Sequence, residues 1–448
     1  MASASEHELL TGRTVELLQT MIRNECVNDG TVGSGQEIRN AEVLGSVLAD
    51  AGIDHELFHA APGRTSLVAR IEGTDPDAPS LCLNGHTDVV PVTPSGWSRD
   101  PFGGELVDGE VWGRGAVDML NLTASMAVAL THLVASGFRP RGDVVFLAVA
   151  DEESGSAWGA RWMAEHHADL ITTDYVLTEN GGLHGGTDSA PTVGVTVGEK
   201  GAAWRRLTVR GTPGHGSTPF RSNNALVTAA GVVTRLGEYR PPPRFHELWR
   251  DQVESLRVDD ETKAALLDPA RIDDALDQME GPASHLYSCS HTTFSPNTVT
   301  SQTKTNVIPD TVTIDLDVRT MPGDGPDEVD AHLREALGDL YERVEVEPLM
   351  NDRASISRTD NPLWDSLQRA VGARYPGAQL RPQVSVGFTD ARVHRDLGAI
   401  AYGAGLLSPS VSARDFGARF HGNDERIDVE SLGLTTQLWI DVVRDLLG

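Results

Sequence analysis

Lysine is nearly absent from this chain, and negative charge is in large excess. Of the 448 residues only Lys200, Lys263 and Lys304 are lysines, so arginine supplies almost all of the positive charge. The formal net charge is -28, which argues against binding to nucleic acid or to an anionic membrane surface. The shortage of lysine itself is typical of codon bias and predicts no function.

Cysteines and long apolar runs are also scarce. The three cysteines, Cys26, Cys82 and Cys289, are too few and too scattered for a disulfide framework. No apolar run approaches the roughly 20 residues that a membrane-spanning helix needs. The first residues show no cationic segment followed by an apolar one, so we expect no signal peptide. We therefore predict a cytoplasmic protein without a membrane partner.

The length and the apolar pattern predict two domains of mixed α/β type. A chain of 448 residues exceeds what one hydrophobic core usually supports. Apolar strands that alternate with helices indicate a mostly parallel sheet covered by helices, with ligands at the carboxyl ends of its strands. The first part is predicted to contain helices at 14–22, 37–51 and 120–136, and strands at 66–71, 80–83 and 143–150.

The order of predicted strands and helices changes after residue 198. The order strand, helix, strand, strand, helix, strand is typical of a split β-α-β unit. We predict these elements at 200–210, 224–236, 305–307, 311–319, 327–340 and 343–348. Residues 199–350 are therefore predicted to form an inserted α+β domain. Residues 1–198 and 351–448 would form the catalytic domain, with later elements at 361–375, 398–403 and 432–447.

The first candidate site is the segment LCLNGHTDVV at residues 81–90. His86 and Asp88 lie two residues apart on a nearly extended chain, so their side chains share a side. One can hold a metal while the other contacts it or orients the imidazole through its second nitrogen. Such a pair alone is more often a surface turn. Its significance comes from four later motifs: GRGAVDM with Asp118, ADEESGS with Glu152 and Glu153, LTEN with Glu179, and HGNDE with His421.

These motifs contain the donor set of a two-metal centre. Two divalent ions about 3.5–4 Å apart need a bridging carboxylate, terminal histidine or carboxylate ligands, and an open position. Asp118 is the predicted bridge, because it follows glycines that let the backbone approach closely. Nitrogen and oxygen donors suit two divalent ions per subunit, with zinc as the first choice and cobalt or manganese as alternatives. The other ligands are predicted in pairs, one pair for each ion: His86 with Glu179, and Glu153 with His421.

Glu152 is left without a ligand role in this arrangement. A free carboxylate beside metal-bound water is suited to act as a general base. Any one of these carboxylates or histidines, standing alone, would be interpreted as an ordinary surface or core residue. The hypothesis rests on their combination.

In this order the motifs resemble the M20 family of dinuclear metallohydrolases, which contains aminoacylases, carboxypeptidases, dipeptidases and N-acyl-amino-acid deacylases. The resemblance covers nearly the whole chain and includes GHTDVVPV, GRGAVDM, ADEESGS, a later Glu, a GHGS and a late His. It implies the same five metal ligands, with Asp88 orienting His86 and Glu152 as the base. It also implies that the inserted domain pairs two subunits in a homodimer. His215, in GTPGHGSTP, would serve the partner's site, although it could also be a simple turn residue.

The resemblance further implies where a substrate is held. Asn306 and Arg319 match family positions near the carboxylate of the substrate. Thr389 lies in a segment, GFTD, that matches a substrate-facing loop. An alternative for Arg319 is an ion-paired strand residue, because Asp315 and Asp317 alternate with it on one face.

Two points depart from the family pattern or stay open. The family usually continues its bridging aspartate as Asp-Met-Lys-Gly-Gly, whereas this chain has Asp-Met-Leu-Asn-Leu at 118–122. This places different side chains next to the site. Asp174 lies close in sequence to Glu179 and is an alternative ligand.

The predicted function is metal-dependent hydrolysis of an amide bond next to a carboxylate, as in N-acyl-amino acids or short peptides. The predicted partner is therefore a small substrate with a free carboxylate. The alternatives are a dipeptidase, or a metal-dependent binding protein without activity. The intact Glu152 argues against the last, because a binding protein has no need of an unliganded carboxylate there.

Overall fold

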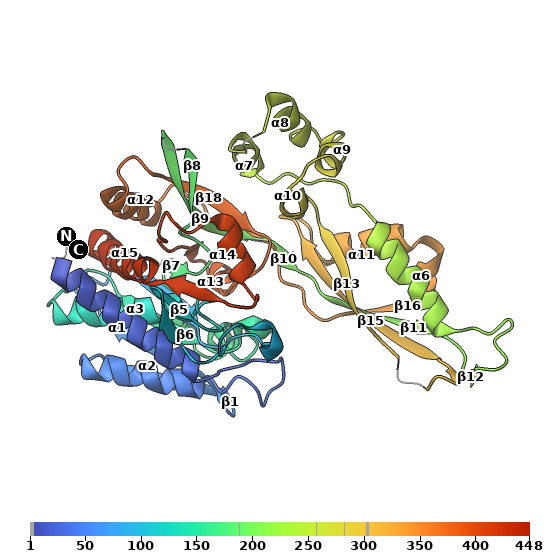
Figure 1. Cartoon of the computed structure of the whole chain (residues 1–448), viewed down its shortest axis with the longest axis horizontal. Helices are drawn as coiled ribbons and strands as arrows, with labels where there is room; N and C mark the ends of the chain where they lie inside the picture. Colours follow the sequence, from blue (N-terminus) through green and yellow to red (C-terminus); the bar gives the residue numbers. More distant parts are fainter. Residues whose placement is uncertain (1–3, 188, 257, 282, 302–303) are drawn as a thin grey trace. The chain divides into compact units, whose positions relative to one another are not determined.

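The computed structural model describes residues 4–187, 189–256, 258–281, 283–301 and 304–448. The chain divides into two compact units (Figure 1). The first unit comprises Met1–Val197, Ser357–Gln383 and Thr389–Gly448, and the second comprises Gly198–Ile356 and Val384–Phe388. The second unit thus includes the short segment Val384–Phe388 in addition to a long insertion. No helix in the described part of the chain is long and apolar enough to cross a membrane.

The first unit is built around a mixed sheet whose central strands are parallel. The strand order is β1-β2-β6-β3-β7-β19-β9-β17, and β8 and β18 also pair with β9. β17 pairs with the last two residues of β9, and these paired residues belong to the second unit. β6, β3, β7 and β19 run parallel to one another, whereas β1 and β2 are antiparallel additions at one edge. The bounds are β1 His55–Ala61, β2 Arg64–Ile71, β3 Leu81–His86, β6 Val144–Val149, β7 Tyr175–Thr178, β8 His184–Thr187, β9 Ala190–Glu199, β17 Ser355–Ile356, β18 Gln379–Ser385 and β19 Ile400–Gly403.

Helices cover both faces of this sheet. Successive side chains of β3 point to opposite faces. Cys82 packs with residues of α4 (Ala160–His166) and α13 (Ala391–Asp396). A Cβ at Gly85, on the other face, would meet Thr123 of α3 (Leu120–Ala135). α3 is buried on nearly all sides, which explains why its sequence is apolar all round. The remaining helices of this unit are α1 Ala4–Arg23, α2 Ile38–Asp50, α5 Ala168–Ile171, α12 Pro362–Arg374, α14 Ala413–Arg419 and α15 Val429–Leu447.

Short elements of the first unit lie outside the large sheet. A three-stranded sheet has the order β20-β5-β4, so it pairs a late segment with two early ones. Its strands are β4 Glu105–Val107, β5 Glu110–Trp112 and β20 Arg426–Asp428, and two 3-10 turns lie at η1 Pro94–Gly96 and η2 Glu152–Ser154. The pairing of β5 with β20 brings the segment before Asp118 next to the segment after His421.

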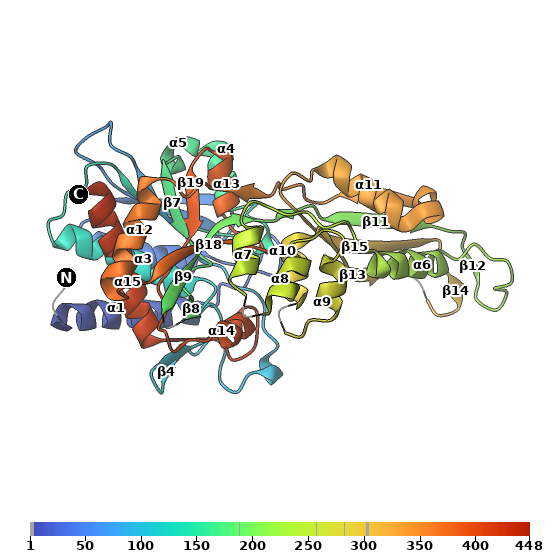
Figure 2. The same cartoon turned by 90° about the horizontal axis from the view of Figure 1, so that it is seen from above.

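The second unit contains an antiparallel sheet with helices on one face. β15 alternates in burial, with Val312, Ile314, Leu316 and Val318 facing the core. Residues of α6 (Ala225–Glu238) and α11 (Pro326–Leu337) complete that core, and α6 lies along β13 and β15 (Figure 2). The strand order is β10-β15-β11-β16, and β13 also pairs with β15. The bounds are β10 Gly201–Ala202, β11 Arg205–Arg210, β13 Thr293–Thr300, β15 Thr311–Thr320, β16 Val344–Pro348, η3 Gly338–Arg343, and a separate pair β12 Gly214–His215 with β14 Val307–Ile308.

Four short helices of the second unit have no counterpart in the sequence-based prediction. They surround the buried Trp249. Each has at most eight residues, which is too short for a clear 3.6-residue period. Their bounds are α7 Trp249–Glu254, α8 Asp260–Leu266, α9 Ile272–Asp277 and α10 Ala283–Ser290.

Two strand predictions need correction. The strand predicted at 80–83 continues to His86, because the backbone of β3 pairs with β6 as far as His86 and Val149. The strand predicted at 200–210 is interrupted at 203–204, where β10 ends and β11 has not begun. The predicted helices that became α2, α3, α12 and α15 are confirmed to within a few residues.

Candidate metal centre

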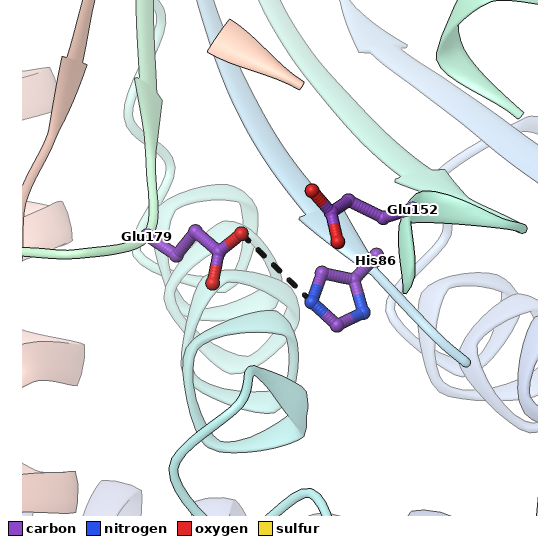
Figure 3. A group of neighbouring side chains, drawn as sticks. All are labelled: His86, Glu152 and Glu179. Carbon is purple, nitrogen blue, oxygen red and sulfur yellow. Dashed lines mark ion pairs between the residues drawn. The ribbon is translucent and has the colours of Figure 1, made fainter. Parts of the chain in front are cut away.

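Three side chains meet where parallel strands of the first unit end. His86 is the last residue of β3, Glu152 begins η2 shortly after β6, and Glu179 directly follows β7. Their side chains face one another (Figure 3). One ligand atom from each lies within 4.8 Å of the others. The carboxyl-end edge of the sheet is therefore the site, as expected for this type of fold.

Asp118 lies between two histidines. Its Oδ1 is 3.2 Å from Nε2 of His86, and its Oδ2 is 3.3 Å from Nε2 of His421. Glu179 Oε1 lies 3.9 Å from the same nitrogen of His86, and Glu153 Oε2 lies 3.2 Å from that of His421. We call His86 with Glu179 the buried half of the centre, and Glu153 with His421 the exposed half. One oxygen of Asp118 faces each half.

The pKa values of the site reflect several carboxyl groups that are buried close together. Burial raises the pKa of Glu152 and of Glu179 well above the usual range, and for Glu179 the charge of Asp118 adds to this effect. Burial and then the charge of Asp118 raise the pKa of Glu153 to about 7. Burial also opposes ionisation of Asp118, but hydrogen bonds with His421 and His86 outweigh it and lower its pKa. Four carboxyl groups and two imidazoles thus share one small volume.

This donor set fits divalent metal ions. Oε1 of Glu152 and Oε1 of Glu153 are buried and have no hydrogen-bond partner among the described residues. A buried polar atom without a partner is costly, and a cation beside it removes that cost. The available donors are imidazole nitrogens and carboxylate oxygens, which suit zinc, cobalt or manganese.

Asp88 contacts His86 through its backbone carbonyl more closely than through its carboxylate. Nδ1 of His86 lies 3.0 Å from the backbone carbonyl of Asp88, closer than the 3.5 Å to its carboxylate. A proton donated from Nδ1 to that carbonyl leaves Nε2 free to face Asp118. The carboxylate of Asp88 accepts hydrogen bonds from the backbone N–H groups of Glu152 and Glu153, both at 3.2 Å, and from Asn28 at 2.8 Å. Asp88 therefore also fixes the turn that carries the two glutamates.

Glu179 and Asp174, which were alternative ligands, lie at opposite ends of β7. The carboxylate of Asp174 accepts hydrogen bonds from the backbone and hydroxyl groups of Ser80, both at 2.8 Å, at the start of the strand. Glu179 lies at the end where His86 is found. The geometry therefore favours Glu179.

The departure from the family motif lies in the first turn of α3. Leu120, Asn121 and Leu122 are all buried. A Cβ at Gly115 would come within 2.7 Å of Leu120, so the two residues pack closely. Two buried leucines and a buried asparagine thus stand where the family has lysine and glycines, and Asp118 keeps its contacts to both histidines.

Thr389 is buried in the first unit at the start of α13. Its hydroxyl oxygen accepts a hydrogen bond from the backbone N–H of Ala391 at 3.1 Å, and its carbonyl accepts one from Arg392 at 2.9 Å. The next residue, Asp390, accepts a hydrogen bond from Ser156 at 2.5 Å. These contacts fix the beginning of α13, and the predicted contact of Thr389 with substrate stays a prediction.

The other predicted substrate residues belong to the second unit. His215 is exposed in β12, with Nδ1 2.7 Å from the hydroxyl of Ser217. Asn306 is exposed next to β14, and its carbonyl accepts a hydrogen bond from Gly216 at 2.8 Å. His215 therefore lies in β12, and Asn306 directly precedes the strand that pairs with it. Their catalytic and binding roles stay predictions.

Arg319 is engaged in the ion pair that was its alternative role. Its Nε and Nη2 donate to the carboxylate of Asp317 at 2.7 and 3.1 Å, whereas Asp315 pairs with Arg206. The guanidinium also lies 4.7 Å from the ring centroid of Phe388. Its Nη1 has no hydrogen-bond partner in the described part of the chain. This nitrogen is buried, so the binding role of Arg319 stays a prediction.

Sequence reasoning missed three residues that support the centre. Asn28 donates to Asp88 at 2.8 Å and to Asp151 at 3.0 Å, and no local motif marks it. Glu425 accepts hydrogen bonds from the backbone of the Asp118 segment, and Arg114 pairs with Glu425. Both stand inside motifs that were quoted for other residues, GRGAVDM and HGNDE. The signal was therefore present in the sequence, but its partner lay about 300 residues away.

A parallel-stranded core with histidines and carboxylates arranged around one shared aspartate defines a metallohydrolase. The model of Peptidase family M20/M25/M40 matches residues 82–445. The chain belongs to this family, whose members are peptidases and amidohydrolases.

Relatives and solved structures agree with this assignment. The chain is 29% identical over 415 residues to the N-fatty-acyl-amino acid synthase/hydrolase of Xenopus tropicalis, covering 90% of this chain and 79% of that protein. The M20 family metallo-carboxypeptidase of Sulfolobus solfataricus has the same fold, with a TM-score of 0.73 at 18% identity over 97% of this chain and 98% of that one. A dinuclear metal-binding M20 peptidase of Bacillus subtilis also has this fold. Its TM-score is 0.60 at 14% identity, over 98% of this chain and 99% of that one.

Proposed function

We propose that this protein hydrolyses an amide bond next to a free carboxylate, with N-acyl-amino acids as the first substrate class and short peptides as the second. The observation that carries the proposal is the position of Asp118, whose two oxygens face two separate pairs of ligands. This arrangement suits two divalent ions, with zinc as the first choice. The relative named for N-fatty-acyl-amino acids supports the choice of substrate.

The metal ligands proposed are Asp118 as the bridge, His86 and Glu179 in the buried half, and Glu153 and His421 in the exposed half. When bound, the ions supply a Lewis acid for the scissile carbonyl and lower the pKa of a water molecule. Glu152 accepts the proton of that water and returns it to the leaving amine.

The residues proposed to bind the substrate are Arg319, Asn306 and Thr389. The guanidinium of Arg319 is the group proposed to bind the carboxylate, because charge-assisted hydrogen bonds are strong. Asn306 and Thr389 would add neutral hydrogen bonds. His215 of one subunit would donate to the developing oxyanion in the site of its partner.

A substrate panel tests the proposed function. The purified protein is offered N-acyl-amino acids of increasing acyl length, dipeptides, and the same acyl-amino acids with the carboxylate converted to an amide. Release of free amine is measured before chelation, after chelation, and after return of zinc, cobalt or manganese. We expect hydrolysis of acyl-amino acids that needs both the metal and the free carboxylate. A higher kcat/KM for dipeptides would identify a dipeptidase, and activity that survives chelation would refute the proposal.

The homodimer is part of the same proposal. Phe220 and Val227 of the second unit are 83% and 69% exposed, which is unusual for large apolar side chains and suits a contact between two copies. His215 lies close to Phe220 in sequence. Light scattering should give the mass of two chains. Inactive His215→Ala and inactive Glu152→Gln proteins should regain part of the activity when their subunits exchange, and verified mixed dimers without activity would contradict the role of His215.

A cytoplasmic location completes the proposal. All three cysteines are buried and unpaired, as is usual for a protein of a reducing compartment. Fractionation of cells that produce the protein tests this location.

A further inference from the structure

A buried ion pair joins the two segments that carry Asp118 and His421. Glu425 is fully buried, and Arg114 is 3% exposed. Oε2 of Glu425 accepts a hydrogen bond from Nη1 of Arg114 at 2.6 Å. Its Oε1 accepts hydrogen bonds from the backbone N–H groups of Val117 and Asp118, at 2.7 and 3.2 Å. The carboxylate of Glu425 therefore fixes the backbone at the shared ligand.

Arg114 extends the connection to the other segment. Its Nη2 donates to the backbone carbonyl of His421 at 3.3 Å, and its guanidinium lies 5.3 Å from the ring centroid of Trp97. The backbone N–H of Gly113 also donates to the carbonyl of Glu425 at 2.9 Å. One arginine thus contacts both Glu425 and His421, and one glutamate contacts both Arg114 and Asp118.

His421 needs such a connection more than the other ligands do. It lies on a loop between α14 and β20, and its side chain is 56% exposed. Its backbone has φ +53, a conformation that residues with a Cβ adopt only when their surroundings hold them there. Packing of the side chain cannot supply that constraint, because the imidazole is partly in solvent. The hydrogen bond from Arg114 to its carbonyl contributes to this constraint, beside the contacts of the imidazole with Asp118 and Glu153.

We propose that the Arg114–Glu425 ion pair is a positioning device that keeps the exposed half of the metal centre in register with Asp118. It thereby sets the affinity of the centre for the second ion. This inference rests on the proposed function, in which Glu153 and His421 are ligands. Neither Arg114 nor Glu425 touches the metal or the substrate in this account, so both are positioning residues.

Arg114 and Glu425 contact different parts of the metal centre. Arg114 acts on His421, which belongs to the exposed half alone. Glu425 acts on the backbone of Asp118, which serves both halves. Loss of Arg114 should therefore weaken one ion selectively, whereas loss of the charge on Glu425 should weaken that ion and, to a smaller degree, the other.

The test is a metal titration of the metal-free protein with cobalt, followed by calorimetry. The wild type should bind two ions. In Arg114→Met one binding step should weaken by about 10–100-fold, a typical effect for residues that support metal ligands, while the other step stays at wild-type affinity. Glu425→Gln should weaken the same step at least as much. The double variant should be no weaker than the more affected single variant, because the pair acts as one unit.

Two further variants make the result specific. Glu110→Gln is the matched control, because the carboxylate of Glu110 in β5 accepts hydrogen bonds from Arg419 of α14 and Arg426 of β20. It should leave both steps unchanged. Arg114→Lys keeps the charge but lacks the second N–H group that reaches His421, so it should reproduce the selective loss even if Arg114→Met does not fold. Circular dichroism and thermal unfolding of the metal-free variants establish that each is folded.

The outcomes separate this inference from the proposed function. Folded Arg114 variants that bind both ions as the wild type does would overturn the inference, and so would an equal loss of both ions. A wild type that binds two ions but hydrolyses no substrate in the panel would overturn the proposed function alone. In that case the titration of the variants would still decide the role of the ion pair.

Discussion

His86 and His421 face the two oxygens of the same aspartate, yet they come from opposite kinds of structure. His86 ends a central strand, is fully buried, and has its backbone carbonyl bound by the hydroxyl of Thr123 at 2.8 Å. His421 lies on a loop with its side chain 56% exposed. The sheet holds the first ligand, whereas side-chain contacts from a distant segment hold the second. We therefore expect the exposed half to bind its ion more weakly and to lose it first.

Asp118→Ala should have the largest effect, because it removes the one residue that both halves share. We expect loss of both ions and amide hydrolysis at background level. Metal content per chain after gel filtration, measured by mass spectrometry, checks this. Asp169→Ala, which removes an exposed carboxylate of α5, is the control and should retain both ions. One ion kept at full affinity in Asp118→Ala would contradict the shared position.

Glu152→Gln should lower kcat by about 100–10,000-fold, the usual contribution of a general base. It should keep both ions, since Glu152 belongs to neither half in our assignment. The same two measurements, metal content and kcat, check the variant.

A role as metal ligand is the alternative for Glu152. Its carboxylate is close enough to His86 and Glu179 to share an ion with them. Loss of the more tightly held ion in Glu152→Gln would place Glu152 in the buried half as a ligand.

His86→Ala and His421→Ala should differ in stability more than in metal content. Each should lose the ion of its own half. His86→Ala also leaves a cavity at a buried strand end, which costs free energy of unfolding, whereas an exposed loop histidine leaves none. Thermal unfolding of the metal-free proteins should therefore show a lower midpoint for His86→Ala. Equal midpoints would mean that the loop of His421 is as firmly packed as the strand.

The smallest effect should be a dependence of the metal-free protein on pH. Hydrogen bonds with Asp118 and Glu153 raise the pKa of His421 from 6.5 to about 10. A pKa raised in the folded state stabilises the fold fully below the unfolded value, and the contribution disappears as pH rises through the folded value. Burial raises the pKa of Glu153 from 4.5 to about 7, and this shift also makes the folded state less stable as pH rises.

The unfolding midpoint in the presence of chelator should therefore fall by a few degrees as pH rises from about 6.5 to about 10. In His421→Ala most of this fall should disappear. A midpoint that is flat over this range in the wild type, or that falls equally in the variant, would contradict the assigned interactions.

The sequence predicted the parts of the centre that local pattern encodes. His86 was found because an apolar strand leads into it, and Asp118 because it stands between a glycine-rich turn and an apolar helix. The meeting of His86 with Glu152 followed from the rule that ligands gather where parallel strands end. In the buried half, backbone geometry alone nearly determines where the ligands lie.

What the sequence did not predict depends on contacts between distant segments. Glu425 stands in the quoted HGNDE motif, yet its role depends on Arg114 and Val117, about 300 residues earlier. Asp88 was expected to act through its carboxylate on His86, but its carbonyl is closer. Which atom of a residue makes the contact depends on backbone dihedrals that a motif does not specify. The assignment of each ligand to an ion stays a prediction until metal is measured.

The segment Val384–Phe388 has a practical consequence for anyone who wishes to study the first unit alone. Val386 packs against the helices around Trp249, the carbonyl of Ser385 binds the backbone of Lys200 at 3.0 Å, and the ring of Phe388 lies 6.0 Å from that of Trp204. Deleting residues 198–356 would leave these groups behind without their partners. In the shortened protein the apolar side chains of Val386 and Phe388 would be exposed next to Thr389, and we expect it to aggregate. A usable truncation must therefore replace 384–388 with a polar linker as well as remove the long insertion.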